Sequence, residues 1–260
     1  MTFLDIEKAY DSVPREKVWE IMEKKGVGKQ TIEILQGMYD KSFSCVQTQV
    51  ERIDWFRNVT GLRQDSVVSP LLFIMVMDEI VKESKEAYKG RKMKLMLFAE
   101  DIVVWGANSK EVQEQLDILN EKIEKYGMKF SVEKSKTLVL TRGDRKGKGQ
   151  INIKAQEIEI VDNFKYLGSE LMQNARMEEE ISKRVQQSNA FYQCVRDLVW
   201  GKEVPMKCKE VLYKAYFIPI MTYASETWTV TRREESKIQA SEMKFLRSML
   251  GKTRRDRVRN

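Results

Sequence analysis

The sequence predicts an α+β domain over residues 1–172, followed by an all-α domain over residues 173–260. Two patterns predict this division. Short apolar stretches with strand character alternate with amphipathic helices in the first part, whereas only helical patterns recur from about residue 175 onward. The 260 residues are enough to bury a substantial core in one large domain or two small ones.

Capping and turn residues predict the first elements. Residues 2–6 have the character of a short strand, because apolar residues run directly into an acid without helix signals. Ser12 as N-cap and Pro14 in the first turn predict the start of a helix, which Gly26 is expected to end. The elements expected next are a helix at 30–40, a hairpin formed by 43–50 and 53–60, and a helix at 67–87.

A second hairpin is expected from strands at 93–98 and 102–105, with a turn at 99–101 that carries two acids. One buried helix face then follows from apolar residues at i, i+4, i+7 and i+11, namely Val112, Leu116, Leu119 and Ile123. The Gly-rich basic run 142–150 predicts a loop. The remaining predicted elements are short strands at 151–154, 157–161 and 164–167 and helices at 175–198, 206–221 and 232–250.

Composition and charge narrow the classes of function. Hydrophobic residues make up 42% and charged residues 33%, which is typical of a globular protein. The net charge is +7, and residues 231–260 hold ten Lys/Arg against four acids. A basic end favours a polyanionic partner such as nucleic acid, although a solvated basic tail explains the same charge equally well.

Several classes of site are excluded by what the sequence lacks. It contains no histidine, so histidine-based triads and metal centres are excluded from this chain. The three cysteines are far apart without CxxC spacing, which argues against a disulfide framework or a zinc site and favours a reducing compartment. No signal peptide or apolar run of membrane-spanning length is visible, so no membrane association is expected and the nucleus and cytoplasm both stay open.

Three acidic residues suggest a metal site. They lie in FLDIEKAYD at 3–11 and FAED at 98–101, with GLRQDSVVSPLLF at 61–73 between these segments. Asp5 at a strand end and the pair Glu100–Asp101 at a hairpin tip can converge on one point. Mg²⁺ takes oxygen ligands, and two such ions support nucleotidyl transfer. Each acid alone is more often a solvated turn residue.

Taken together and in this order, these segments resemble the reverse transcriptases of non-LTR (LINE-type) retrotransposons. Two later segments agree, because GMKFSVEKSK at 127–136 is similar to the lysine motif of that family and FKYLG at 164–168 to its primer grip. The resemblance covers essentially the whole chain. It implies a right-hand polymerase fold, with the palm at 1–172 and a helical thumb with a basic C-terminus at 173–260. It also implies an RNA-directed DNA polymerase that uses two Mg²⁺ ions to add dNTPs to a primer 3′-OH on an RNA template.

The resemblance implies roles for individual residues. The catalytic, metal-binding carboxylates are those of Asp5, Glu100 and Asp101, with the backbone carbonyl of Ile6 as an additional metal ligand. The nucleotide-binding residues are Tyr10, Arg63, Gln64 and Lys134, of which Tyr10 is the steric gate against a ribose 2′-OH. The primer- or template-binding residues are Tyr166, Leu167, Gly168, Arg254 and Arg255. Ser69 and Pro70 are expected to start the helix of their motif.

Three departures from the family pattern predict impaired catalysis. The family has aspartate at the position of Glu100, whose extra methylene displaces the carboxylate by on the order of 1 Å, and such a misplacement can cost about 10²-fold in rate. The family has glycine at the position of Asp65, where a side chain and a negative charge now stand beside an expected polyphosphate. The sequence begins almost at the first catalytic strand, without the fingers and the endonuclease domain, which predicts a truncated copy or fragment, or a partial gene model.

Several interpretations therefore stay open. The chain is either an RNA-directed DNA polymerase with residual activity or a non-catalytic nucleic-acid-binding remnant. A protein that never folds stably is a third interpretation. An RNA-copying RNA polymerase fits the acids alone, but Tyr10 and the GLRQ segment argue against it.

Overall fold

A computed structural model describes residues 1–48, 51–89, 91–141 and 149–257. The loop expected at 142–150 lies mostly outside these residues. The chain divides into two compact units, which are described separately below. Unit 1 comprises Met1–Val139 and Gly147–Val161, and unit 2 comprises Leu140–Lys146 and Asp162–Asn260. An α+β unit is followed by a mainly helical one, as the sequence predicts.

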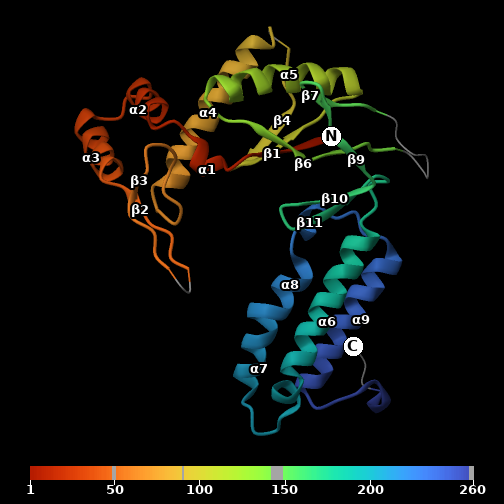
Figure 1. Ribbon diagram of the computed structural model, residues 1–260. Coiled ribbons are helices and arrows are strands. Elements are labelled where there is room, and N and C mark those ends of the chain that lie inside the picture. Colours follow the sequence, from red (N-terminus) through yellow and green to blue (C-terminus); the bar gives the residue numbers. More distant parts are fainter. Residues whose placement is uncertain (49–50, 90, 142–148, 258–260) are drawn as a thin grey trace. The chain divides into compact units, whose positions relative to one another are not determined.

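The described part of unit 1 contains a five-stranded sheet with β1 at its centre (Figure 1). The strand order is β4 (Leu95–Phe98), β5 (Asp101–Val104), β1 (Thr2–Ile6), β6 (Phe130–Leu138) and β9 (Glu159–Val161). Strand β1 pairs antiparallel with both β5 and β6, whereas β6 and β9 are parallel. Phe3 and Leu4 are almost completely buried, as expected for a central strand.

Helices α4 and α5 pack against each other and against the sheet of unit 1 (Figure 1). Helix α5 (Ser109–Lys125) buries all four residues of the predicted apolar face, Val112, Leu116, Leu119 and Ile123. Helix α4 (Ser69–Ala87) begins at the predicted serine, with proline in its first turn. The expected helix start and face are therefore confirmed.

The segment between β1 and α4 differs in detail from the prediction. It contains α1 (Ala9–Ser12), α2 (Arg15–Lys24), α3 (Lys29–Asp40), β2 (Phe43–Ser44) and β3 (Phe56–Arg57). Ser12 is not the expected N-cap, because it belongs to α1 and its hydroxyl donates to the carbonyl of Ala9 at 3.1 Å. Gly26 does follow the end of α2, with φ +80°. The β2–β3 hairpin has far shorter strands than expected.

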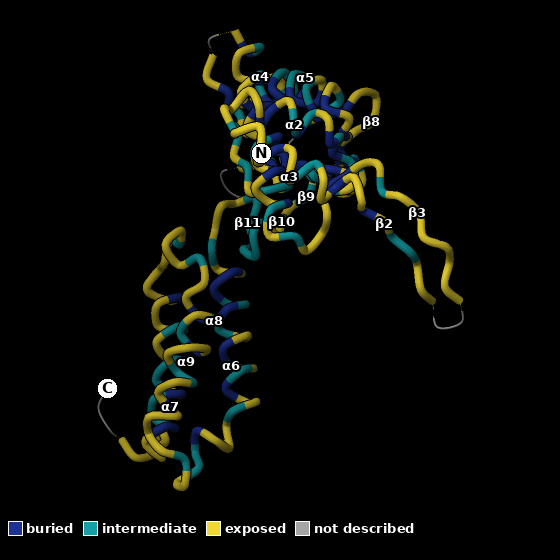
Figure 2. The backbone as a smooth tube through the Cα atoms, turned by 90° about the vertical axis from the view of Figure 1, so that its left-hand side faces the viewer, coloured by how far each residue is buried: buried dark blue, intermediate teal, exposed yellow. Residues whose placement is uncertain are grey.

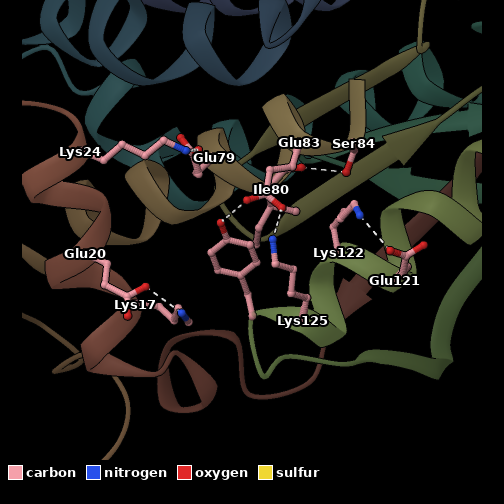
Figure 3. Close-up of polar contacts among 11 residues, drawn as sticks. Lys17, Glu20, Lys24, Glu79, Ile80, Glu83, Ser84, Glu121, Lys122 and Lys125 are labelled. Carbon is pink, nitrogen blue, oxygen red and sulfur yellow. Dashed lines mark hydrogen bonds and ion pairs between the residues drawn. The ribbon is translucent and has the colours of Figure 1, made fainter. Parts of the chain in front are cut away.

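Buried and half-buried polar contacts connect α2, α4 and α5 within unit 1 (Figure 3). The carboxylate of Glu79 is buried and pairs with Lys24 of α2. Glu83 accepts from Tyr126 at 2.9 Å and pairs with Lys125 at 2.7 Å. Burial, followed by this hydrogen bond, raises the pKa of Tyr126, so the phenol stays protonated as the donor. These contacts fix the helices that cover the sheet.

Short strands complete the two units. The β7–β8 hairpin (Asn152–Ile153 and Gln156–Glu157) belongs to unit 1. The β10–β11 hairpin (Asn163–Tyr166 and Ser169–Met172) belongs to unit 2, and its second strand was not expected. By its contacts this hairpin therefore groups with unit 2, and the domain boundary at 172 stays a prediction. The assignment of palm and thumb to these regions stays a prediction.

The helices of unit 2 pack around an aromatic core. They are α6 (Glu178–Trp200), α7 (Met206–Leu212), a π-helical turn (Tyr213–Phe217), α8 (Ile218–Thr222) and α9 (Arg232–Met249). Phe217 and Phe245 are buried with ring centroids 4.7 Å apart, and Tyr192 packs edge-on against Phe245. Figure 2 shows buried residues along the inner sides of these helices. The predicted helix at 206–221 is confirmed as α7, the π-turn and α8.

Among the described residues, no helix combines the length and the apolar character required to cross a lipid bilayer.

Candidate active site

Strand pairing in unit 1 brings the two predicted acidic segments together. Leu4 of β1 pairs with Ile102 of β5, so the next residue, Asp5, lies beside the start of β5. Asp101 is the first residue of β5, and Glu100 lies in the turn that precedes it. Asp5 and the adjacent pair Glu100–Asp101, 95 residues apart in sequence, therefore belong to one edge of the sheet.

The charges of Asp5 and Glu100 act on the carboxylate of Asp101. Burial raises the pKa of Asp101, and the negative charges of Glu100 and Asp5 raise it further. The Oδ2 atom of Asp5 is buried and accepts no hydrogen bond from the described residues. An ion pair with Lys134, whose Nζ lies 3.8 Å from this oxygen, supplies a positive charge. The site therefore concentrates negative charge that a cation would stabilise.

Replacement of Asp101 with asparagine should stabilise unit 1 at neutral pH. A folded-state pKa above the unfolded value means that the ionised carboxylate destabilises the fold at any pH above the folded pKa. This destabilisation disappears below the ordinary aspartate pKa of about 4, because both states are then protonated. In thermal melts, Asp101→Asn should have a higher midpoint than the unmodified chain at about pH 7 and the same midpoint at about pH 3. An equal gain from Asp54→Asn, an exposed aspartate of the same unit, would contradict this explanation.

A bulge in β6 brings Lys134 to the acidic edge. Phe3 pairs with Lys136 but Asp5 pairs with Ser131, so β6 carries more residues than β1 between these two pairs. The Ser135 hydroxyl donates to the Ser131 carbonyl at 2.6 Å and accepts from the Asp5 amide at 3.3 Å, which bridges the irregular segment. Sequence reasoning proposed Lys134 by resemblance alone and could not foresee this bulge.

Tyr10 lies close to Glu100. Its ring stacks on Phe73 of α4, with centroids 4.9 Å apart and an interplanar angle of 17°. Burial raises its pKa, and the charge of Glu100 adds to this shift. The half-buried ring is thus rigidly supported next to the hairpin turn. Ile6, the other residue of this segment, is buried at the end of β1 and pairs with Phe130.

The GLRQ segment is bonded to the residues that follow β1. The amide of Leu62 donates to the Tyr10 carbonyl at 2.7 Å, and the amide of Gly61 donates to the Val13 carbonyl at 3.0 Å. A Cβ on Gly61 would lie 2.7 Å from the Asp11 carbonyl oxygen, so only glycine fits this approach. The side-chain amide of Gln64 donates to both Asp11 carboxylate oxygens, at 3.1 and 3.2 Å. Arg63 is exposed beside it.

Arg15, which sequence reasoning missed, holds this segment in place. Its buried guanidinium donates to the carbonyls of Tyr39 at 3.1 Å, Asn58 at 2.6 Å, Thr60 at 3.2 Å and Gly61 at 2.8 Å. No pattern in the sequence distinguishes Arg15 from a solvated residue in the first turn of α2. These four hydrogen bonds hold the start of the GLRQ segment and the residues before it in place.

Asp65, at the predicted glycine position, has φ +59°. This left-handed conformation is the one that glycine adopts without steric cost and that other residues adopt at a cost of roughly 1–2 kcal/mol. Aspartate is among the residues that tolerate it best. The departure noted in the sequence thus coincides with a backbone that favours glycine. Ala99, before Glu100, has a similar φ of +51°.

The donor chemistry of the site suits a hard divalent cation, but its arrangement does not form a ligand set. Carboxylate oxygens are the ligands that Mg²⁺ prefers, and the buried Asp5 oxygen without a hydrogen bond is available to one. Within the described part of the chain, however, no three Asp, Glu, Cys or His side chains are grouped closely enough to hold a metal ion. The residue types fit a metal, and the side chains would need to move toward it.

The predicted primer-grip residues form a tight turn in unit 2. Leu167 and Gly168 both have positive φ, +47° and +83°. They connect Tyr166 to Ser169, which pair with each other across the β10–β11 hairpin. The Tyr223 hydroxyl donates to the Leu167 carbonyl at 2.7 Å. A Cβ on Gly168 would lie 3.1 Å from that hydroxyl oxygen, so the turn fits closely against Tyr223, the residue that follows α8.

Arg184 of α6 completes this contact. It donates to the Gly168 carbonyl at 2.6 Å and to the buried Glu180 carboxylate at 2.5 Å. Its guanidinium also lies over the Tyr223 ring, 4.6 Å from the centroid. Arg184 and Tyr223 were not proposed from the sequence, because both donate to backbone carbonyls of a distant turn.

The basic residues Arg254 and Arg255 lie elsewhere in unit 2. They form an exposed 3-10 turn after α9, capped by the Thr253 side chain. Tyr192, in the second half of α6, contacts Ser248 near the end of α9, whereas Arg184 and its turn lie near the start of α6. The structure therefore places the two sets of predicted primer- or template-binding residues at different ends of the helices.

Comparison with known proteins assigns the family. The reverse transcriptase (RNA-dependent DNA polymerase) family matches residues 1–171. The Pol polyprotein of the type-1 retrotransposable element R2 of Nasonia vitripennis is 24% identical over 181 residues, which cover 65% of this chain and 18% of that protein. The corresponding R2DM polyprotein of Drosophila melanogaster is 24% identical over 180 residues, 64% of this chain and 17% of that protein. The chain thus spans less than a fifth of these relatives.

Solved telomerase structures from Candida tropicalis align with 96% of the chain. The apo form has a TM-score of 0.49 at 13% identity over 47% of its own chain, and the form with a telomeric RNA fragment has 0.47 at 12% over 43%. The family match itself covers well over half of the sequence and includes every acidic residue of the site. The chain therefore belongs to the reverse transcriptase (RNA-dependent DNA polymerase) family, as the reverse transcriptase domain of a non-LTR element.

Proposed function

We propose that this domain descends from an RNA-directed DNA polymerase that extends a primer on an RNA template, and that its own catalytic site is impaired. The observation that carries the proposal is the convergence of Asp5 with Glu100 and Asp101 on one edge of the sheet, beside Tyr10. These residues come from the two acidic segments that resemble the family motifs. The family match spans both.

The reaction is nucleotidyl transfer. The primer 3′-hydroxyl oxygen attacks the α-phosphorus of a dNTP, the bond to the β-phosphate oxygen breaks, and pyrophosphate leaves as the hydroxyl proton is lost. Bound Mg²⁺ ions would supply charge stabilisation at the attacking and leaving oxygens. Asp5, Asp101 and Glu100, with the Ile6 carbonyl, are the groups that would hold them.

Other residues would bind and orient the substrates. Tyr10 presents a flat, supported ring beside the carboxylates, where it would exclude a ribose 2′-hydroxyl. Gln64 and Arg63 follow the glycine turn and would contact the incoming nucleotide. Lys134, whose ammonium reaches Asp5, would exchange this partner for a triphosphate oxygen. In unit 2, the turn of Tyr166, Leu167 and Gly168 would support the primer.

A second function, nucleic-acid binding without catalysis, is favoured by a separate observation. The described residues do not form a metal ligand set, and both Glu100 and Asp65 depart from the family pattern. Cationic residues such as Arg254 and Arg255 would still bind phosphates in this case, because such contacts need no metal.

Primer extension with an RNA template, Mg²⁺ and dNTPs tests the proposal. We expect no product from the unmodified chain and measurable product from Glu100→Asp with Asp65→Gly, because shortening the side chain by one methylene corrects a displacement that can cost about 10²-fold in rate. Glu157→Asp with Asp54→Gly makes the same chemical changes at exposed positions away from the acidic edge and should restore nothing.

The outcomes separate the two functions. Product from the double variant that is lost on Asp5→Ala supports impaired polymerase descent. Extension by the unmodified chain, lost on the same substitution, would overturn the impairment. No product from either protein, with tight nucleic-acid binding by both, would favour the binding function.

A further inference from the structure

A pocket of about 380 Å³ lies in unit 2, between residues of α6 and residues at and beyond the end of α9. Figure 1 shows these two helices side by side, in agreement with their contacts. The Tyr166–Ser169 turn and Arg184 do not line the pocket, so it is separate from the contact described above. We refer to it as the basic pocket, after its charged and aromatic lining of Tyr192, Trp200, Lys244, Arg247, Lys252 and Arg254.

The polar groups on the aromatic side of the basic pocket are bonded to one another. The Trp200 indole N–H donates to the Tyr192 hydroxyl at 2.9 Å, and this hydroxyl is bonded to the Ser248 hydroxyl at 2.8 Å. Ser248 in turn donates to the Lys244 carbonyl at 2.7 Å. This chain uses every N–H and O–H donor of the three side chains. The aromatic side therefore offers a ligand mainly apolar surface.

Positive charge lines the same pocket. None of the described lining residues is an acid. Lys244, Lys252 and Arg254 are exposed and form no ion pair with any residue that the structure describes. Asp256, in the turn that follows, accepts from the Thr253 hydroxyl at 2.9 Å and does not line the pocket. Cations gathered around a concave apolar surface favour a ligand that is both anionic and partly apolar.

We propose that the basic pocket binds an acidic peptide segment of a partner protein. One apolar side chain of the peptide would lie against Tyr192 and Trp200. Flanking carboxylates would pair with Lys244, Lys252 and Arg254 at the rim. Recognition of acidic motifs by clustered cations is a recurring mode of peptide binding. This interaction goes beyond nucleotidyl transfer and needs no catalytic activity.

A nucleic-acid strand would be attracted by the same cations, but the aromatic side of the pocket suits it less well. A nucleobase buried there would lose water from its polar edges without meeting a free donor, and each unpaired group costs binding free energy. The pocket also lies near the small end of the range of ligand sites, about 300–1,000 Å³. This size suits one side chain better than a run of stacked bases.

Helix α9 supplies a matched pair of variants. Ala240 lines the basic pocket, whereas the adjacent Gln239 does not, and both are exposed. Ala240→Glu and Gln239→Glu each add one carboxylate, and glutamate is a good helix former. A second pair neutralises one exposed lysine each. Lys252→Gln changes the pocket, and Lys207→Gln changes α7, where the lysine does not line the pocket.

Fluorescence anisotropy of the full chain with a fluorescein-labelled peptide, one phenylalanine between two pairs of glutamates, measures binding. We expect Ala240→Glu to weaken binding about 10-fold or more, because its carboxylate repels those of the peptide. Lys252→Gln should weaken it about threefold, as expected for one exposed charge pair. Gln239→Glu and Lys207→Gln should each weaken it less than about twofold, because their charges lie outside the pocket. Thermal melts verify that each variant folds.

Variants of the peptide test the two parts of the ligand separately. Serine in place of phenylalanine keeps the charge and should weaken binding about 10-fold or more, because the apolar burial is lost. Glutamine in place of the glutamates should weaken binding by a similar factor and remove most of its salt dependence.

Several results would overturn the proposal. No binding of the phenylalanine peptide by the folded chain would do so, as would equal losses in Ala240→Glu and Gln239→Glu. Equal affinity for the serine peptide would show that only charge is recognised. Tighter binding of a labelled oligothymidylate that Ala240→Glu weakens and Gln239→Glu does not would assign the pocket to nucleic acid instead. Primer extension tests none of these outcomes, so the proposed function and the peptide site can fail independently.

Discussion

Replacement of Arg184 with methionine is expected to destabilise unit 2 by about 3–5 kcal/mol, because it leaves a buried carboxylate without its partner. Glu180 is 1% exposed and receives the Arg184 guanidinium at 2.5 Å. The same substitution removes the donor to the Gly168 carbonyl and the cation over Tyr223. Urea unfolding followed by far-ultraviolet circular dichroism measures the loss as a shift of the unit 2 transition.

Lys183, the residue before Arg184, provides the control for this substitution. Lys183 pairs with Glu170 at 2.8 Å but is 40% exposed, so Lys183→Met should cost less than about 1 kcal/mol. The pair Arg184→Met with Glu180→Met should recover most of the loss, since no uncompensated charge then stays buried. Equal losses from Lys183→Met and Arg184→Met would show that the buried pair has no special part in unit 2.

Replacement of Arg15 with methionine is expected to destabilise unit 1 by about 3 kcal/mol or more. The guanidinium satisfies four backbone carbonyls, and each buried acceptor left unpaired costs roughly 1–3 kcal/mol, less where water can enter. Arg15→Lys should restore less than half of this, because an ammonium cannot reproduce the planar fork of donors. Urea unfolding of unit 1 measures both variants.

Lys17 of the same helix provides the comparison for Arg15. Its ion pair with Glu20 is exposed on both sides, so Lys17→Met should change the unfolding free energy by no more than about 0.5 kcal/mol. Full stability in Arg15→Met would mean that other contacts hold the GLRQ segment. The segment 58–61 would then owe its placement to other hydrogen bonds, such as those of the Gly61 and Leu62 amides and of Asn58 with Ser42 and Ser44.

The elements that local patterns specify were predictable from the sequence. The central strand, the apolar face of α5 and the start of α4 depend on periodicity and capping within a few residues, and each was confirmed. The order of the motifs also predicted that Asp5 would lie beside Glu100 and Asp101. Strand pairing brings these segments together as expected.

The features that long-range contacts specify were not predictable. The bulge that brings Lys134 to Asp5 arises from the register between β1 and β6, and no local signal marks it. Arg15 and Arg184 are ordinary helix residues in sequence, yet both are buried because they donate to carbonyls of distant turns. Ser12 is not the N-cap of α2, because it is the last residue of the separate short helix α1.

The left-handed backbone at residue 65 has a consequence for how easily the site could be repaired. Its φ of +59° is a left-handed conformation that glycine adopts without steric cost. Aspartate and glycine codons differ by one base, as do those of glutamate and aspartate. Two single-base changes would therefore place glycine at position 65 and aspartate at position 100, the first of them in a backbone already suited to glycine. In evolutionary terms, the change at position 65 needs no change in the backbone around it.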